Sequence, residues 1–94
     1  MVNVFVRHRI KDYTVWKQVF DRYVAKRRAG GERSYKVARL VGEPDNLCLF
    51  FEWDTAAKAE RFIASPELAS ALQQAGVAEK PEIYIAEEVA SGKT

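Results

Sequence analysis

The sequence of 94 residues contains one cysteine, one histidine and three prolines. A single cysteine, Cys48, excludes an internal disulfide, and its position between two leucines favours a small buried side chain over a reactive thiol. A metal site needs three or four ligands at usable spacing, which one histidine, one cysteine and scattered carboxylates do not supply. We therefore expect no bound metal.

Long apolar runs and an excess of charge of one sign are also missing. No segment approaches the roughly 18 consecutive apolar residues of a membrane span, so no membrane association is expected. The N-terminus MVNVFVRHRI lacks the pattern of a signal peptide, which favours a cytoplasmic location. The net charge of +2 argues against a nucleic-acid partner, and the run Lys26-Arg27-Arg28 is read as a complement to a helix dipole rather than as an anion patch.

The segment 46–53, NLCLFFEW, is the most informative part of the chain. Its pattern predicts a strand that is apolar on both faces, because side chains alternate along a strand. One face carries Leu47, Leu49, Phe51 and Trp53, and the other carries Cys48 and Phe50. A chain of this length has helices for one layer only. We therefore expect a second copy of the chain to cover the other face.

Periodicity and turn residues predict the remaining elements. Strands are expected at 2–8, 34–41, 46–53 and 82–89. A first helix starts after Asp12 as N-cap and ends at Gly30-Gly31, and a second covers 56–75 with a restart at Ser65-Pro66. The segment 42–46 is read as the turn of a hairpin, with Pro44 at its second position.

The order β-α-β-β-α-β predicts an α+β fold of the ferredoxin-like type. Right-handed crossovers give an antiparallel sheet of order 4-1-3-2 with both helical segments on one face. Residues 1–89 are expected to form this single domain, and residues 90–94 a flexible tail. The uncovered sheet face is the expected interface of a homodimer.

The segment 50–72, FFEWDTAAKAERFIASPELASAL, resembles the antibiotic biosynthesis monooxygenase-like family of the dimeric α+β barrel superfamily. Trp53 and Ser65-Pro66 fall at positions that match the family pattern. The resemblance implies a dimeric barrel and a cofactor-independent monooxygenase that acts on an aromatic or polyketide-like small molecule, with no cofactor.

Two positions depart from the pattern of the oxygenase and haem-degrading members of the group. Those proteins usually carry histidines where this chain has Phe62 and Glu67. Because haem ligation needs an axial side chain such as histidine, we expect no haem.

The candidate site is built around His8, the expected proton-transfer residue at the end of the first strand. Topology places Tyr13, Trp16 and Tyr84 at the same end of the sheet, where they would bind a hydrophobic or aromatic ligand. The alternatives are a partly exposed, hydrogen-bonded strand-end histidine and a tryptophan that belongs to the core. Besides the monooxygenase, the sequence leaves open a non-catalytic ligand-binding or accessory domain and an isomerase or cyclase that uses His8.

Overall fold

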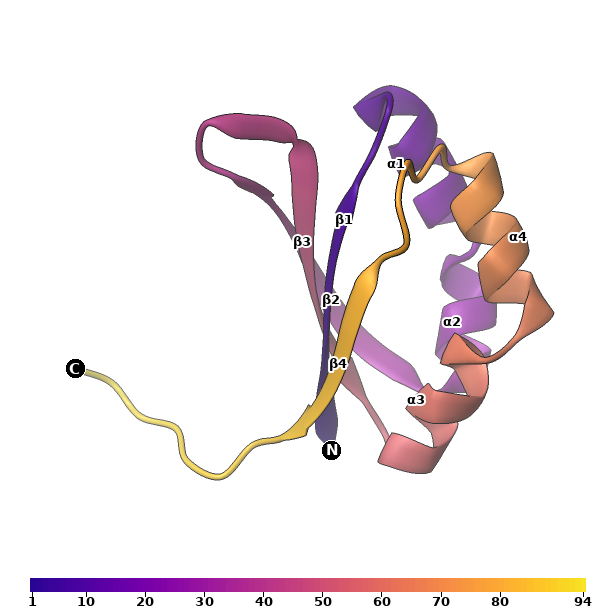
Figure 1. Cartoon of the computed structure of the whole chain (residues 1–94). Coiled ribbons are helices and arrows are strands. Elements are labelled where there is room, and N and C mark those ends of the chain that lie inside the picture. Colours follow the sequence, from indigo (N-terminus) through magenta and orange to yellow (C-terminus); the bar gives the residue numbers. More distant parts are fainter.

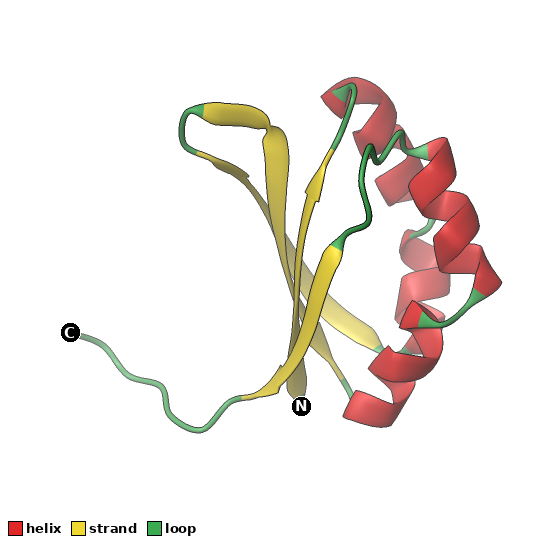
Figure 2. Cartoon of the chain, viewed as in Figure 1, coloured by secondary structure: helices red, strands yellow, loops and turns green.

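The computed structural model describes residues 1–94 and places all the helices on one face of a single four-stranded sheet (Figures 1 and 2). The strands are β1 (Val2–Arg9), β2 (Glu32–Leu40), β3 (Glu43–Trp53) and β4 (Glu82–Glu87). The helices are α1 (Tyr13–Arg22), α2 (Val24–Gly30), α3 (Ala56–Ile63) and α4 (Pro66–Gln74). None of these helices is long and apolar enough to cross a membrane.

The sheet order is β2-β3-β1-β4, and every neighbouring pair is antiparallel. This order is the same as 4-1-3-2 read from the other edge, so the predicted ferredoxin-like α+β fold is confirmed. The long central strands β1 and β3 run side by side from Val2↔Trp53 to Arg9↔Asn46. Their helix-facing side chains form the floor of the core.

The predicted helix starts are confirmed by side-chain caps. Asp12 accepts the backbone N–H of Val15 at 3.1 Å, and Ser65 accepts that of Leu68 at 3.2 Å. Pro66 is the first residue of α4, where its missing N–H costs nothing because the first turn has no helical acceptor for it. These caps set where α1 and α4 begin and therefore which of their residues face the sheet.

Two local predictions are wrong. The helix expected to run unbroken to Ala29 is interrupted at Tyr23, which separates α1 from α2. The hairpin turn lies at Val41-Gly42, where Gly42 has φ +82°, a conformation that favours glycine. Pro44 belongs to β3 instead, at an irregular stretch of the β2–β3 pairing where a missing N–H is tolerated.

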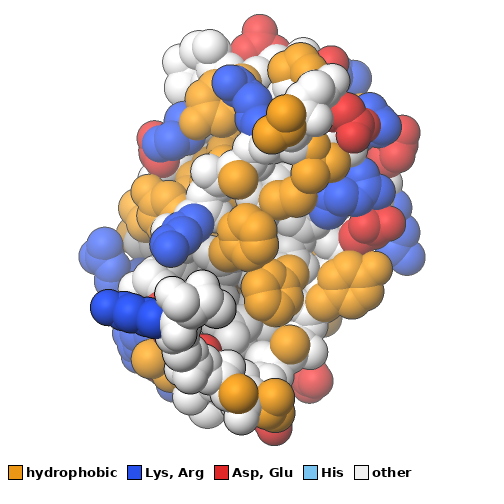
Figure 3. Space-filling view, turned by 90° about the vertical axis from the view of Figure 1, so that its left-hand side faces the viewer, with side chains coloured by type: hydrophobic (Ala, Val, Ile, Leu, Met, Phe, Trp, Pro, Cys, Tyr) orange, Lys and Arg blue, Asp and Glu red, His pale blue; other side chains and the backbone are white.

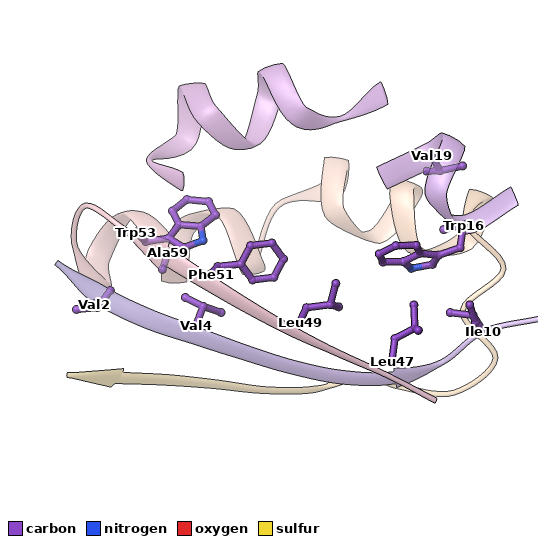
Figure 4. Packing of buried hydrophobic residues seen from close by; sticks show 11 residues of the cluster. Val2, Val4, Ile10, Trp16, Val19, Leu47, Leu49, Phe51, Trp53 and Ala59 are labelled. Carbon is purple, nitrogen blue, oxygen red and sulfur yellow. The ribbon is translucent and has the colours of Figure 1, made fainter. Parts of the chain in front are cut away.

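The core lies between the sheet and the helices, and the predicted alternation of β3 is confirmed. Leu47, Leu49, Phe51 and Trp53 are all buried on the helix side. Figure 4 shows these side chains pointing from the strands toward Trp16 and Val19 of α1 and Ala59 of α3. Because the helices cover this layer along the length of β3, its apolar side chains are almost fully removed from water.

The opposite face of the sheet is bare and carries apolar side chains (Figure 3). Phe5 and Phe50 pack edge to face with ring centroids 5.8 Å apart, and both remain more than a third exposed. Tyr84 pairs with Phe5 across β1 and β4 and is 61% exposed. Exposed aromatic rings gathered on one flat face are typical of an interaction surface.

Candidate functional site

A cavity of about 100 Å³ lies between the sheet and the helices. Its 21 lining residues include members of all four strands and all four helices, and seventeen of them are hydrophobic. The titratable side chains in the wall are those of His8, Tyr23, Arg27 and Glu32. The site is therefore an apolar chamber with a few polar groups, as expected for a small-molecule pocket.

His8 lies in the wall because it shares a face of β1 with Val2 and Val4, and that face is the one under the helices. Its side chain is only 5% exposed. The indole Nε1–H of Trp16 donates a hydrogen bond to His8 Nε2 at 3.1 Å, and the two rings meet at 73°. His8 and Trp16 thus lie together on the cavity wall, and their roles in proton transfer and ligand binding stay predictions.

The hydrogen bond from Trp16 fixes the chemical state of His8. Since Nε2 accepts a hydrogen bond, the neutral ring carries its own proton on Nδ1. Burial lowers the pKa of His8 from 6.5 to about 4, because the charged imidazolium loses its hydration in this apolar setting. At neutral pH the ring is therefore uncharged and presents Nδ1–H as a donor, and this Nδ1 has no partner within the chain.

The lowered pKa of His8 predicts that stability falls with acidification. The unfolded chain binds a proton at His8 below pH 6.5, whereas the folded chain does so only below about 4. The neutral His8 therefore contributes its full share to the free energy of unfolding above pH 6.5, and this share is lost as the pH falls toward 4. The expected loss is about 2 to 3 kcal/mol between pH 7 and pH 4.5. Urea unfolding at the two pH values measures this loss.

A His8→Gln variant provides the control, because glutamine can accept the Trp16 N–H and does not titrate. Between pH 7 and pH 4.5 the free energy of unfolding of this variant should fall by about 2 to 3 kcal/mol less than that of the parent protein. Carboxylates with lowered pKa values, such as Asp54 and Glu82, contribute equally to both proteins. Equal slopes in the two proteins would contradict the assignment to His8.

The other polar part of the wall is a buried ion pair between α2 and β2. Arg27 Nε donates to Glu32 Oε1 at 2.8 Å, and Arg27 Nη1 donates to the carbonyl oxygen of Phe20 at 2.6 Å. The guanidinium also lies over the Phe20 ring, 3.8 Å from its centroid. Arg27 and Glu32 are each 6% exposed, so little water reaches the pair.

The chain turn between α2 and β2 sets the geometry of this pair. Gly31 follows the helix at φ +129°, and a Cβ there would meet Trp53 and Lys58 side-chain atoms at 3.2 Å. A glycine is therefore needed for both its conformation and its lack of a side chain. The turn brings Glu32 back against the last turn of α2, where Arg27 meets it.

The run Lys26-Arg27-Arg28 lies near the end of α2, as the helix-dipole interpretation requires, but the burial of Arg27 was not expected. Lys26 and Arg28 are exposed, but Arg27 faces inward. The sequence did carry a signal for this: Arg27 follows Phe20 and Tyr23 at helical spacing on the apolar stripe. Because Lys26 and Arg28 are also basic, this position of Arg27 on the apolar stripe was not recognised.

Two of the predicted ligand-binding residues lie outside the cavity wall. Tyr13 stacks on the far side of Trp16, with centroids 5.9 Å apart, and receives the Arg39 guanidinium on its ring at 4.5 Å. Tyr84 lies on the bare face of the sheet, so the expectation that it lines a pocket with His8 is wrong. Strand β4 does start beside the end of β1. Ile83 and Ile85, however, point to the helix side of the sheet, so Tyr84 between them points to the opposite side.

Nothing in the structure gathers ligands for a metal ion: no group of three or more His, Cys, Asp or Glu side chains is suitably placed. Phe62, at the position where the haem-binding resemblance would require a histidine, packs on Trp53 with ring centroids 5.3 Å apart. That position is therefore part of the apolar wall.

Solved structures of similar architecture cover nearly the whole chain. A protein from Bordetella bronchiseptica with a provisional assignment as an antibiotic biosynthesis monooxygenase has a TM-score of 0.78 and 15% identity, over 95% of this chain and 97% of its own. A cofactor-independent oxygenase from Streptomyces nogalater, SnoaB, solved as a point mutant, has a TM-score of 0.74 and 16% identity, over 96% and 94%. A protein from Deinococcus radiodurans with the same provisional assignment has a TM-score of 0.69 and 19% identity, over the full length of both chains.

No protein-family model and no curated protein matches the sequence. The chain thus has the ferredoxin-like fold of the antibiotic biosynthesis monooxygenases of known structure, and the resemblance read from residues 50–72 is confirmed at the level of that fold. At such low identities the likeness does not extend to individual site residues. The function therefore depends on the chemistry of the cavity residues themselves.

Proposed function

We propose that the protein is a homodimer that binds a small, flat, largely apolar aromatic molecule in the cavity and oxygenates it without a cofactor. The observation that carries the proposal is an apolar chamber lined by two polar groups, His8 near one end and the Arg27–Glu32 pair near the other. An engineered cavity of about 150 Å³ holds benzene, so a chamber of this order suits a single ring, with some opening for a larger ligand. The shared fold with SnoaB supports the reaction class.

In such a reaction the substrate supplies the electrons. An acidic CH₂ group beside an aromatic ring or carbonyl loses a proton, and the resulting carbanion reduces O₂ and forms a C–O bond. The hydroperoxide then loses water, so that CH₂ and O₂ become C=O and H₂O. The protein has to accept one proton and stabilise the negative charge that spreads onto a substrate oxygen.

In this proposal Glu32 accepts the proton, while His8 lies at the other end of the chamber, because His8 pairs with Leu47 and Glu32 with Trp53, about 20 Å away along β3. His8 Nε2 is engaged by Trp16, so His8 can donate only through Nδ1–H, to a polar atom at the end of the ligand remote from Glu32. Glu32 is the carboxylate in the cavity wall, and burial raises its pKa while Arg27 opposes that rise. A carboxylate that is paired yet more basic than usual suits the role of proton acceptor.

A second function is favoured by the Trp16–His8 hydrogen bond. A histidine whose basic nitrogen is already occupied is well suited to hold a ligand and poorly suited to move a proton. The protein would then be a non-catalytic ligand-binding domain. An isomerase or cyclase with His8 as the base would require Trp16 to release Nε2 during turnover.

A cavity-blocking variant tests the binding step. Ala71 of α4 lines the cavity, and Ala71→Phe should fill part of it and weaken the binding of aromatic hits from a thermal-shift screen by at least about tenfold, since a filled cavity no longer removes the ligand from water. Ala69→Phe makes the same change on the exposed side of the same helix and should leave binding unchanged. Equal affinities in the two variants would show that ligands bind elsewhere.

Oxygen uptake separates the two functions. The parent protein, treated with a chelator and free of flavin, should consume one O₂ per molecule of a bound substrate with an acidic CH₂ group. Glu32→Gln should bind the same substrate and consume O₂ far more slowly, because the proton acceptor is lost. Binding without O₂ uptake in the parent protein would leave the non-catalytic function.

A further inference from the structure

Only two buried side-chain polar atoms in the chain lack a hydrogen-bond partner, His8 Nδ1 and Arg27 Nη2, and both belong to side chains that line the cavity. Buried donors are rarely left unpaired, because the lost hydration is not replaced. Both exceptions line the chamber, one near each end, which indicates that a bound molecule supplies the missing acceptor at the Arg27 end.

Arg27 is held rigidly around its unpaired atom. Nε is bound to Glu32, Nη1 to the Phe20 carbonyl, and the guanidinium plane lies over the Phe20 ring. These three contacts hold the guanidinium in place, and Nη2 is its one nitrogen without any hydrogen-bond partner. A preorganised donor of this kind selects for an oxygen at a defined place in the ligand.

The charge of the ion pair limits what that oxygen can be. The carboxylate of Glu32 already balances the guanidinium of Arg27. A ligand carboxylate would add a second negative charge to an apolar chamber with no further cation in its wall, which is costly. A carbonyl oxygen offers lone pairs and brings neither charge nor an additional donor that needs a partner.

We infer that Arg27 is a specificity-determining residue that donates a hydrogen bond to the carbonyl oxygen of a neutral aromatic ketone or aldehyde, and that it discriminates against both hydrocarbons and carboxylates of the same shape. The inference rests on the ligand-binding cavity proposed above and adds the identity of a polar group on the ligand. It assigns to Arg27 a role that is separate from proton transfer.

Three ligands of nearly equal shape test the inference: acetophenone, α-methylstyrene and benzoate. The variant is the double substitution Arg27→Met with Glu32→Leu, which removes both charges together and keeps the wall filled. The affinity ratio of acetophenone to α-methylstyrene, measured by calorimetry, should fall at least about tenfold from the parent protein to the variant, since a hydrogen bond to a charged donor is lost. Benzoate should bind the parent protein more weakly than acetophenone.

Each other result has a defined meaning. If acetophenone and α-methylstyrene bind but their ratio is the same in both proteins, Arg27 does not select the carbonyl, and the cavity proposal stands. If benzoate binds most tightly, the site takes an anion and the inference is overturned. If none of the three binds the parent protein, the proposed cavity function fails and the inference fails with it.

A measurement on the parent protein keeps the test independent of the variant. The guanidinium N–H resonances of Arg27 in ¹⁵N-labelled protein should shift on addition of acetophenone and remain in place on addition of α-methylstyrene. Equal shifts with the two ligands, or none with either while both bind, would overturn the inference even if the double variant did not fold.

Discussion

A Phe50→Glu variant is expected to sediment as a monomer of 10.7 kDa at micromolar concentrations where the parent chain sediments at twice that mass. Phe50 lies near the centre of the bare sheet face, in contact with Phe5. In a two-fold dimer each residue of the interface occurs twice, so one substitution introduces two unpaired charges into buried surface. At a few kcal/mol for each, the dimer dissociation constant should rise by about a thousandfold or more.

The matched control is Val15→Glu on the outer side of α1. Val15 is 45% exposed and Phe50 is 42% exposed, so the two substitutions place the same charge at equally accessible apolar positions on opposite sides of the molecule. The Val15 variant should remain dimeric. A parent chain that is monomeric and stably folded would contradict the proposed assembly, which requires about 800 Å² of this face to be buried on each partner.

The second large effect is expected at the buried ion pair. Arg27→Met alone should destabilise the fold by about 3–5 kcal/mol, because Glu32 is left as an uncompensated charge away from water. The double variant Arg27→Met with Glu32→Leu should be close to the parent protein in stability, because no buried charge remains. Urea unfolding of the three proteins at pH 7 provides the comparison.

Arg33→Met serves as the control for the loss of an arginine. Arg33 is paired with Asp54 at the surface, where water and ions screen the interaction, so its removal should have little effect on stability. If the single Arg27 variant were as stable as the Arg33 variant, the pair would be open to solvent. The role assigned to Arg27 in ligand selection would then lose its basis.

The sequence predicts the fold well where a local rule and the overall layout agree. The alternation of residues 47–53, the Asp12 cap and the Ser65-Pro66 restart each have a direct physical cause within a few residues. The sheet order then follows from the handedness of the two crossovers. These features were sufficient to place His8 beside Trp16 under the helices.

The site was predicted only in part. Its details depend on the face of the sheet to which each strand residue points, and on a residue that is buried although its type is usually exposed. Tyr84 was placed at the right end of the sheet and on the wrong face, although the flanking Ile83 and Ile85 indicate its direction. Arg27 was missed because a buried arginine inside a basic run contradicts the usual exposure of that residue. Pro44 was taken for a turn residue because the actual turn, at Gly42, lies only two positions away.

The polar contacts of the cavity join residues that are near neighbours along the chain. Trp16 is eight positions from His8, and Arg27 is five positions from Glu32, across the turn at Gly31. The apolar remainder of the wall is assembled from segments spread from β1 to β4. Mutations that reshape the apolar wall can therefore accumulate over evolutionary time while two short stretches, residues 8–16 and 27–32, hold the polar groups in position. Under the proposed function, such a division would let the outline of the bound ligand change while its polar anchor stays the same.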